Sequence, residues 1–80
     1  MRIYKHRRFS QWAKHECITD ATLRNAVNEL AHSLYDADLG GGLYKKRVAR
    51  TGQGKRGAYR TLVAFRQNNR CVFVFGFAKS

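Results

Sequence analysis

The stretch that decides the fold is residues 43–79, LYKKRVARTGQGKRGAYRTLVAFRQNNRCVFVFGFAK. It contains three apolar runs of the length and composition typical of β-strands: Leu43–Ala49, Ala58–Arg66 and Cys71–Ala78. Asn68-Asn69 lies between the last two runs and suits a tight hairpin turn, because asparagine tolerates a left-handed backbone. The stretch therefore predicts a three-stranded antiparallel meander.

Side chains alternate between the two faces of a strand, so the last strand is expected to place Phe73, Phe75 and Phe77 on one face. Core packing is the expected role of Phe73 and Phe75. Apolar residues occupy both faces of the last two strands, so the sequence leaves undecided which face of the sheet is open.

The N-terminal residues predict a short strand and a first helix. Arg2–Lys5 is the strand candidate, with two apolar residues. Phe9, Trp12 and Ala13 then recur at helical spacing through about Lys14. Trp12 is expected to anchor the core.

A second helix has the clearest pattern in the chain. Thr19 or Asp20 can cap its first turn, since a short side-chain oxygen accepts hydrogen bonds from free backbone amides. An apolar stripe follows at steps of three and four: Leu23, Ala26, Val27, Leu30, Ala31 and Leu34. We expect this helix to run from about Asp20 to Tyr35, with Gly40–Gly42 turning the chain after it.

These elements predict one α+β domain, residues 1–80. A small antiparallel sheet, made of the short N-terminal strand and the meander, would carry both helices on one face. The other face would be open and basic.

Positive charge is concentrated in the second half of the chain. Residues 1–40 hold six basic and all five acidic side chains, a net charge of +1, whereas residues 41–80 hold ten basic and none acidic, a net charge of +10. Such a field attracts polyanions, of which the phosphate backbone of nucleic acid is the commonest in cells, and an acidic protein partner also fits.

Several other classes of protein are disfavoured. No apolar run is long enough to span a bilayer, and no secretory or targeting pattern follows the basic N-terminus, so a cytoplasmic location is expected. Cys17 and Cys71 stand alone, without the spacing of a metal site. We expect no metal and no small-molecule cofactor, because no carboxylate pair lies near the basic sheet.

Three features of the basic half have both structural and functional interpretations. The loop Gly52–Gly57 is either a simple strand connection or a segment that wraps phosphates. Grouped cations on the strands favour an anion-binding surface over separate solvated charges. Interleaved aromatic residues are either core or platforms on which bases stack, with Tyr59 and Phe77 undecided.

The pattern LYKKRVARTGQGKRGAYRTLVAFR…VFVFGFAKS resembles the RelE/ParE superfamily of bacterial toxins, in particular its HigB-like branch. Shared features are a basic strand, the loop-and-strand Arg50–Arg60, the ending Phe75–Lys79 and the segment Asp36–Arg47. The resemblance spans nearly the whole chain. It implies the toxin of a type II toxin–antitoxin system, with a cognate antitoxin, the ribosome and mRNA as partners.

The resemblance also implies roles for particular residues. It assigns catalysis to Lys45, Arg47, Arg60 and Lys79. In the family's chemistry the 2′-hydroxyl of mRNA attacks the adjacent phosphate, so we expect Lys45 to act as base and Arg60 to stabilise the transition state. RNA binding is expected from the remaining basic and aromatic positions: Lys46, Arg50, Lys55, Arg56, Tyr59, Arg66 and Phe77.

One departure from the family pattern is visible at the end of the chain. Family members continue into a C-terminal helix, whereas this sequence stops at Ser80. The expectation is a RelE-like fold with this helix absent and with impaired ribonuclease activity. The alternative function is a ParE-like gyrase poison, or a non-catalytic basic module that binds nucleic acid or antitoxin.

Overall fold

The computed structural model describes residues 2–49, 58–66 and 70–78. They form two helices and a five-stranded sheet: β1 (Arg2–Lys5), α1 (Arg7–His15), α2 (Asp20–Ala31), β2 (Ala37–Gly40), β3 (Leu43–Val48), β4 (Tyr59–Arg66) and β5 (Arg70–Ala78). The strand order is β1-β5-β4-β3-β2, with β1 parallel to β5 and the other pairs antiparallel. The α+β fold and the three-strand meander are therefore confirmed. The expectation of an antiparallel sheet is wrong for the N-terminal strand, because β1 is parallel to β5 and the sheet is mixed.

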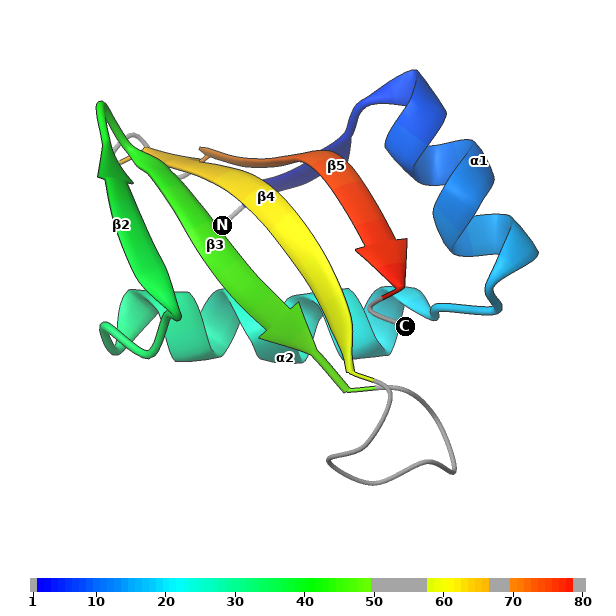
Figure 1. The fold of residues 1–80 in the computed structure, drawn as a ribbon, viewed down its shortest axis with the longest axis horizontal. Coiled ribbons are helices and arrows are strands. Elements are labelled where there is room, and N and C mark those ends of the chain that lie inside the picture. The colour runs from blue at the N-terminus through cyan, green and yellow to red at the C-terminus, as the bar shows by residue number, and fades with distance from the viewer. Residues whose placement is uncertain (1, 50–57, 67–69, 79–80) are drawn as a thin grey trace.

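Both helices pack on the same face of the sheet. In Figure 1, α2 crosses behind the strands and α1 stands beside β5, so neither helix lies over the near face. The helices contribute Phe9, Ala13, Leu23, Ala26, Val27 and Leu30 to the core, and the sheet contributes Val48, Tyr59, Val63, Cys71 and Phe73. Phe9 stacks on Phe73 with ring centroids 5.1 Å apart, which fixes α1 against β5.

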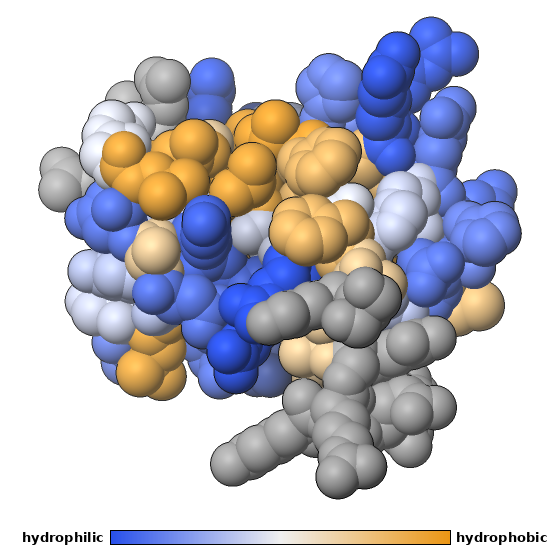
Figure 2. All heavy atoms as spheres, in the orientation of Figure 1, coloured by the Kyte–Doolittle hydropathy of each residue, from blue (hydrophilic) through white to orange (hydrophobic). Residues whose placement is uncertain are grey.

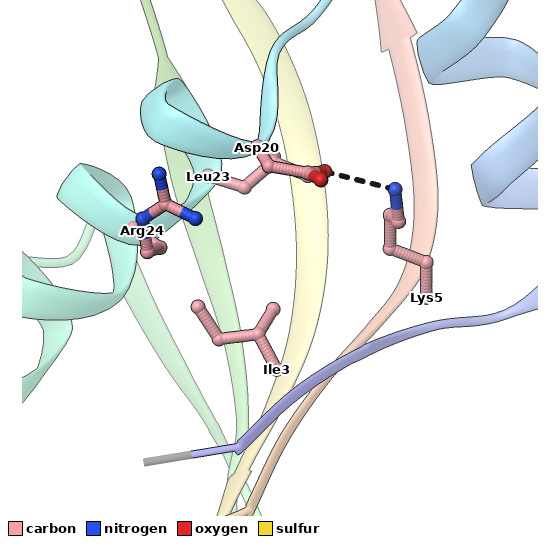
Figure 3. A pocket seen from close by; sticks show the side chains of 5 residues that line it. All are labelled: Ile3, Lys5, Asp20, Leu23 and Arg24. Atoms are coloured by element: carbon pink, nitrogen blue, oxygen red, sulfur yellow. Dashed lines mark hydrogen bonds and ion pairs between the residues drawn. The ribbon is translucent and has the colours of Figure 1, made fainter.

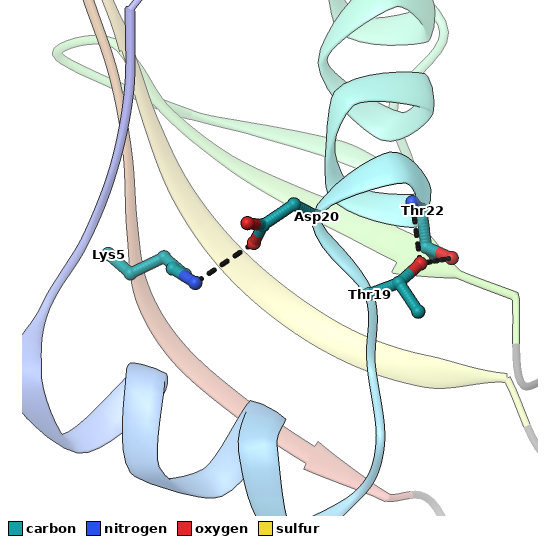
Figure 4. A network of polar contacts seen from close by, with 4 residues as sticks. All are labelled: Lys5, Thr19, Asp20 and Thr22. Carbon is teal, nitrogen blue, oxygen red and sulfur yellow. Dashed lines mark hydrogen bonds and ion pairs between the residues drawn. The ribbon is translucent and has the colours of Figure 1, made fainter.

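Helix α2 begins as predicted and ends early. The hydroxyl of Thr19 accepts a hydrogen bond from the Thr22 amide at 3.2 Å, so Thr19 is the cap (Figure 4). The helix ends at Ala31 instead of Tyr35, because Ser33 takes a left-handed conformation with φ 61° and interrupts the helical repeat. Leu34, expected on the apolar stripe, is 55% exposed.

Strand β2 was not predicted. It is four residues long and pairs with β3 through a turn in which Gly40, Gly41 and Gly42 all have positive φ. The carboxylate of Asp38 accepts a hydrogen bond from the Gly40 amide at 2.9 Å, which stabilises this turn. The glycines thus connect two strands, where the sequence suggested the exit of a helix.

A bulge in β5 changes the face on which its side chains lie. Val63 pairs with Phe73, but the preceding residue Leu62 pairs with Phe75, so Val74 is an extra residue in β5. Phe73 is fully buried under the helices, whereas Phe75 is 52% exposed on the opposite face. The prediction that Phe75 packs in the core is therefore wrong, because strict alternation fails at the bulge.

Candidate functional site

The open face of the sheet carries two rows of side chains that cross three strands. The β3–β4–β5 pairing aligns Lys45 with Leu62 and Phe75 in one row. It aligns Arg47 with Arg60 and Phe77 in the next. Directly paired residues on neighbouring strands have Cβ atoms about 4.5–5.5 Å apart. The pairing therefore brings three of the predicted catalytic residues, Lys45, Arg47 and Arg60, to one place.

A groove runs along these rows. It encloses about 480 Å³ and is lined by the open-face residues Lys45, Arg60, Leu62, Phe75 and Phe77, and by Lys46 and Thr61, which are themselves buried. Figure 2 shows this face: hydrophobic side chains extend across its upper part to its centre, and hydrophilic side chains lie directly below them. The groove thus combines an apolar wall with a cationic wall, and no carboxylate belongs to its described lining.

The positive charges of the groove are only partly compensated. Nε of Arg47 lies 3.7 Å from Oδ1 of Asp36, a half-exposed pair that contributes little stability. Among the described residues no acidic side chain forms an ion pair with Lys45 or Arg60. Arg47 and Arg60 face each other across the strands, an arrangement that repels in the free protein and suits an anion placed between them.

Two residues predicted to bind RNA have side chains on the covered face instead. Lys46 is 8% exposed, and its Nζ lies 3.2 Å from Oε1 of Glu29 on α2. Tyr59 is 3% exposed and its hydroxyl donates a hydrogen bond to Oε1 of Glu16 at 2.9 Å. Both alternate with Arg47 and Arg60 along their strands, so their side chains point toward the helices. We therefore withdraw the RNA-binding assignment of Lys46 and Tyr59.

The remaining predicted residues divide into two groups. Phe77 lies in the groove, beside Arg60 on the neighbouring strand. The side chain of Arg66 and four whole residues lie outside what the structure describes: Arg50, Lys55, Arg56 and Lys79.

Phe75 and Leu62 line the groove and were missed by the sequence reasoning. The signal for Phe75 was Gly76, since an isolated glycine within a strand suggests a bulge or a close approach of another group. Here Gly76 accommodates the ring of Trp12, and a Cβ at this position would overlap the indole.

A second cavity lies between β1 and α2, on the side of the helices. It encloses about 290 Å³ and is lined by Ile3, Lys5, Asp20, Leu23 and Arg24 (Figure 3). Nζ of Lys5 donates to Oδ1 of Asp20 at 3.0 Å, and this hydrogen bond, with the charge of Lys5, lowers the pKa of Asp20 (Figures 3 and 4). Lys5 and Asp20 pair with each other, which is the pattern of a structural contact.

Within residues 2–49, 58–66 and 70–78, no three His, Cys, Asp or Glu side chains cluster as a metal site. Neither described helix has the length and apolar character needed to cross a membrane. The candidate site is therefore the groove of cations and aromatic rings.

Comparison with known proteins identifies the family. The family model of the RelE toxin of the RelE/RelB toxin–antitoxin system matches residues 1–80. No curated protein matches the chain significantly. The α+β fold, with two helices on one face of an open sheet, agrees with RelE-like toxins. The chain therefore belongs to the RelE toxin family, and it is the toxin of a toxin–antitoxin system with a cognate antitoxin as its partner.

Proposed function

We propose that this toxin is a ribosome-dependent mRNA endonuclease whose catalytic groups are the cations of the groove. The observation that carries the proposal is the alignment of Lys45, Arg47 and Arg60 on the open face of β3 and β4. The described lining supplies cations and no carboxylate, so the chemistry rests on lysine and arginine. Family members are generally endoribonucleases, which agrees with this proposal.

In the proposed reaction the substrate supplies the nucleophile. The 2′-hydroxyl of one nucleotide attacks the adjacent phosphorus, and Lys45 acts as the general base that takes the hydroxyl proton. A bond forms from the 2′-oxygen to phosphorus, the bond to the 5′-oxygen of the next nucleotide breaks, and that oxygen takes a proton from a water molecule as it leaves. The products are a 2′,3′-cyclic phosphate and a free 5′-hydroxyl.

Arginine suits the second role in this reaction. Negative charge accumulates on the phosphoryl oxygens in the transition state, and fixed guanidinium groups stabilise it without reorganising. Arg60 is half-buried on the central strand, and Arg47 lies directly opposite. Two parallel hydrogen bonds from one guanidinium match the geometry of a phosphate.

The remaining residues of the proposal rest on the sequence. Lys79 stays a catalytic candidate, and the residues proposed to bind the mRNA backbone are Arg50, Lys55, Arg56 and Arg66. Their positive charge would steer the toxin to ribosome-bound mRNA in the cytoplasm. Assignment to the HigB-like branch likewise remains a prediction.

Growth arrest on expression tests this proposal in cells. Arg60→Ala should relieve the arrest while the variant still binds the antitoxin, because Arg60 contributes to chemistry and is not required for the fold. Arg7→Ala, which removes an exposed arginine of α1, should leave the arrest intact. If Arg60→Ala arrests growth like the wild type, the catalytic assignment is wrong, and inhibition of gyrase becomes the better explanation.

A further inference from the structure

Phe75 and Phe77 lie exposed side by side in the groove, and the cleavage chemistry does not explain them. They are 52% and 46% exposed, with ring centroids 5.9 Å apart and ring planes tilted by 44°. Exposed aromatic surface is unfavourable in the free protein, and paired exposed rings usually mark a binding site.

The exposure of these two rings is built into the fold. If Val74 were regularly paired and β5 had no bulge, strict alternation from buried Phe73 would turn Phe75 and Phe77 toward the helices. The bulge turns them outward and leaves Gly76 to face α1, where the Trp12 ring fills the space. Core packing of Trp12 and exposure of the two phenylalanines thus depend on the same bulge.

The surroundings of the rings indicate the chemistry of the ligand. Phenyl rings offer stacking surface and no hydrogen bonds, which suits the face of a nucleic-acid base. Each ring shares its row with a cation: Phe77 with Arg60 and Arg47, and Phe75 with Lys45 beyond Leu62. Bases lying over β5 would therefore leave the backbone phosphates over β3 and β4.

We propose that Phe75 and Phe77 form a platform that holds two adjacent unpaired RNA bases, one on each ring, also in the absence of the ribosome. The phosphate that joins the two nucleotides then lies over Lys45 and Arg60. Identifying this phosphate as the one that is cleaved rests on the endonuclease function proposed above. Because any base can stack on a phenyl ring, the platform should bind RNA with little preference for sequence.

Binding of a short, fully 2′-O-methylated single-stranded RNA tests the platform, because this probe cannot be cleaved. Fluorescence anisotropy should show that the wild type binds. Phe75→Leu and Phe77→Leu should each weaken binding roughly 5- to 150-fold, the loss expected for one stacked base. Phe75→Tyr and Phe77→Tyr should restore most of the affinity, because tyrosine keeps the ring.

Salt dependence separates stacking from charge. The leucine variants should keep the wild-type slope of log affinity against log salt, since they remove no phosphate contact. Arg60→Ala should reduce the magnitude of that slope by about 0.7, the value for one phosphate of a single strand. Tyr35→Leu is the matched control, because Tyr35 is 40% exposed and its ring packs on Tyr44 outside the groove, and it should bind like the wild type.

Two results would overturn the platform: a wild type that does not bind the RNA, or leucine variants that bind the RNA as tightly as the wild type. In the second case, the leucine variants could instead have lost antitoxin binding. That loss would assign the rings to the antitoxin. Thermal unfolding of each variant shows that it is folded, and half-exposed positions tolerate these changes. The binding assay does not measure cleavage. The platform can therefore be confirmed or refuted even if the toxin proves not to be an endonuclease.

Discussion

Arg47 and Arg60 are directly paired across β3 and β4, on the face of the sheet that neither helix covers. Like charges in this position destabilise a sheet, and only Arg47 has a described acidic neighbour, Asp36 at 3.7 Å. The pair is therefore expected to weaken the free protein slightly and to favour any state in which an anion lies between the two guanidinium groups.

Arg60→Gln should accordingly leave the free energy of unfolding unchanged or raise it by up to about 0.5 kcal/mol. Added salt should stabilise the wild type more than the variant, because salt screens a repulsion that the variant lacks. Urea unfolding at low and high salt measures both effects. Arg7→Gln serves as the control, and a loss of more than about 1 kcal/mol in Arg60→Gln would make Arg60 a structural residue.

Removing either partner of the ion pair between Lys46 and Glu29 should lower stability, but by different amounts. The Lys46 side chain is 10% exposed and that of Glu29 is 43% exposed. Glu29→Gln leaves a buried ammonium without its partner and should cost about 1–3 kcal/mol of stability, discounted for the exposed glutamate. Lys46→Met leaves a carboxylate that can turn to water, and it should cost less than about 1 kcal/mol.

Urea unfolding measures the loss of stability in each of these two variants. Equal losses would contradict the argument that only Lys46 of this pair is buried. Lys46→Met also tests whether Lys46 takes part in RNA binding. If the groove acts through Lys45 and Arg60, this variant should retain ribonuclease activity.

Gly76→Ala should destabilise the protein, because its Cβ would overlap the ring of Trp12. The indole has little room to move, since its ring centroid lies 5.6 Å from that of Phe9 and 5.1 Å from that of Tyr59. The expected loss is about 1–3 kcal/mol, typical of overpacking. In a double-mutant cycle Trp12→Phe should relieve part of it, and strictly additive losses would argue against the contact.

The two cysteines should differ in reactivity. Burial raises the pKa of the Cys71 thiol to about 12, whereas Cys17 is exposed. At pH 8 a thiol reagent should modify one cysteine of the native protein and both after unfolding. Rapid modification of Cys71 in the native state would show that β5 opens readily.

The same shift predicts a pH dependence of stability. Because the folded pKa lies above the ordinary value of 9.0, the unfolded chain loses its thiol proton first as pH rises. The contribution of Cys71 is therefore constant below about pH 9 and is lost as the pH rises toward about 12. Lysines and tyrosines also titrate in this pH range. The difference in free energy of unfolding between the wild type and Cys71→Ala, measured against pH, therefore isolates the contribution of Cys71.

The elements with strong periodic patterns were predictable from the sequence. The stripe from Leu23 to Leu30 predicted α2, Thr19 was one of two candidates for its cap, and the apolar runs predicted β3, β4 and β5. The end of α2 was missed because nothing in the sequence marks the left-handed conformation of Ser33. Strand β2 was missed because four residues of mixed polarity carry almost no periodic signal.

The site was predictable as a set of residue types but only partly as an arrangement. Charge concentration indicated an anion-binding surface, the family resemblance assigned Lys45, Arg47 and Arg60 to it, and the strand register brings these three together. The burial of Lys46 depends on Glu29, which is 17 positions earlier in the chain and belongs to another element. The exposure of Phe75 depends on one inserted residue, and such an insertion reverses every assignment that follows it.

Cleavage of mRNA on programmed ribosomes is the most direct test of the endonuclease proposal. The wild-type chain and Arg7→Ala should cut the message, whereas Arg60→Ala should cut at least about 100-fold more slowly, the loss typical of removing one group that stabilises developing charge. Arg60→Ala should still bind the antitoxin and unfold at the wild-type temperature. Equal cutting by the wild type and Arg60→Ala, or no cutting by the wild type, would contradict the proposal that this groove is a ribonuclease active site.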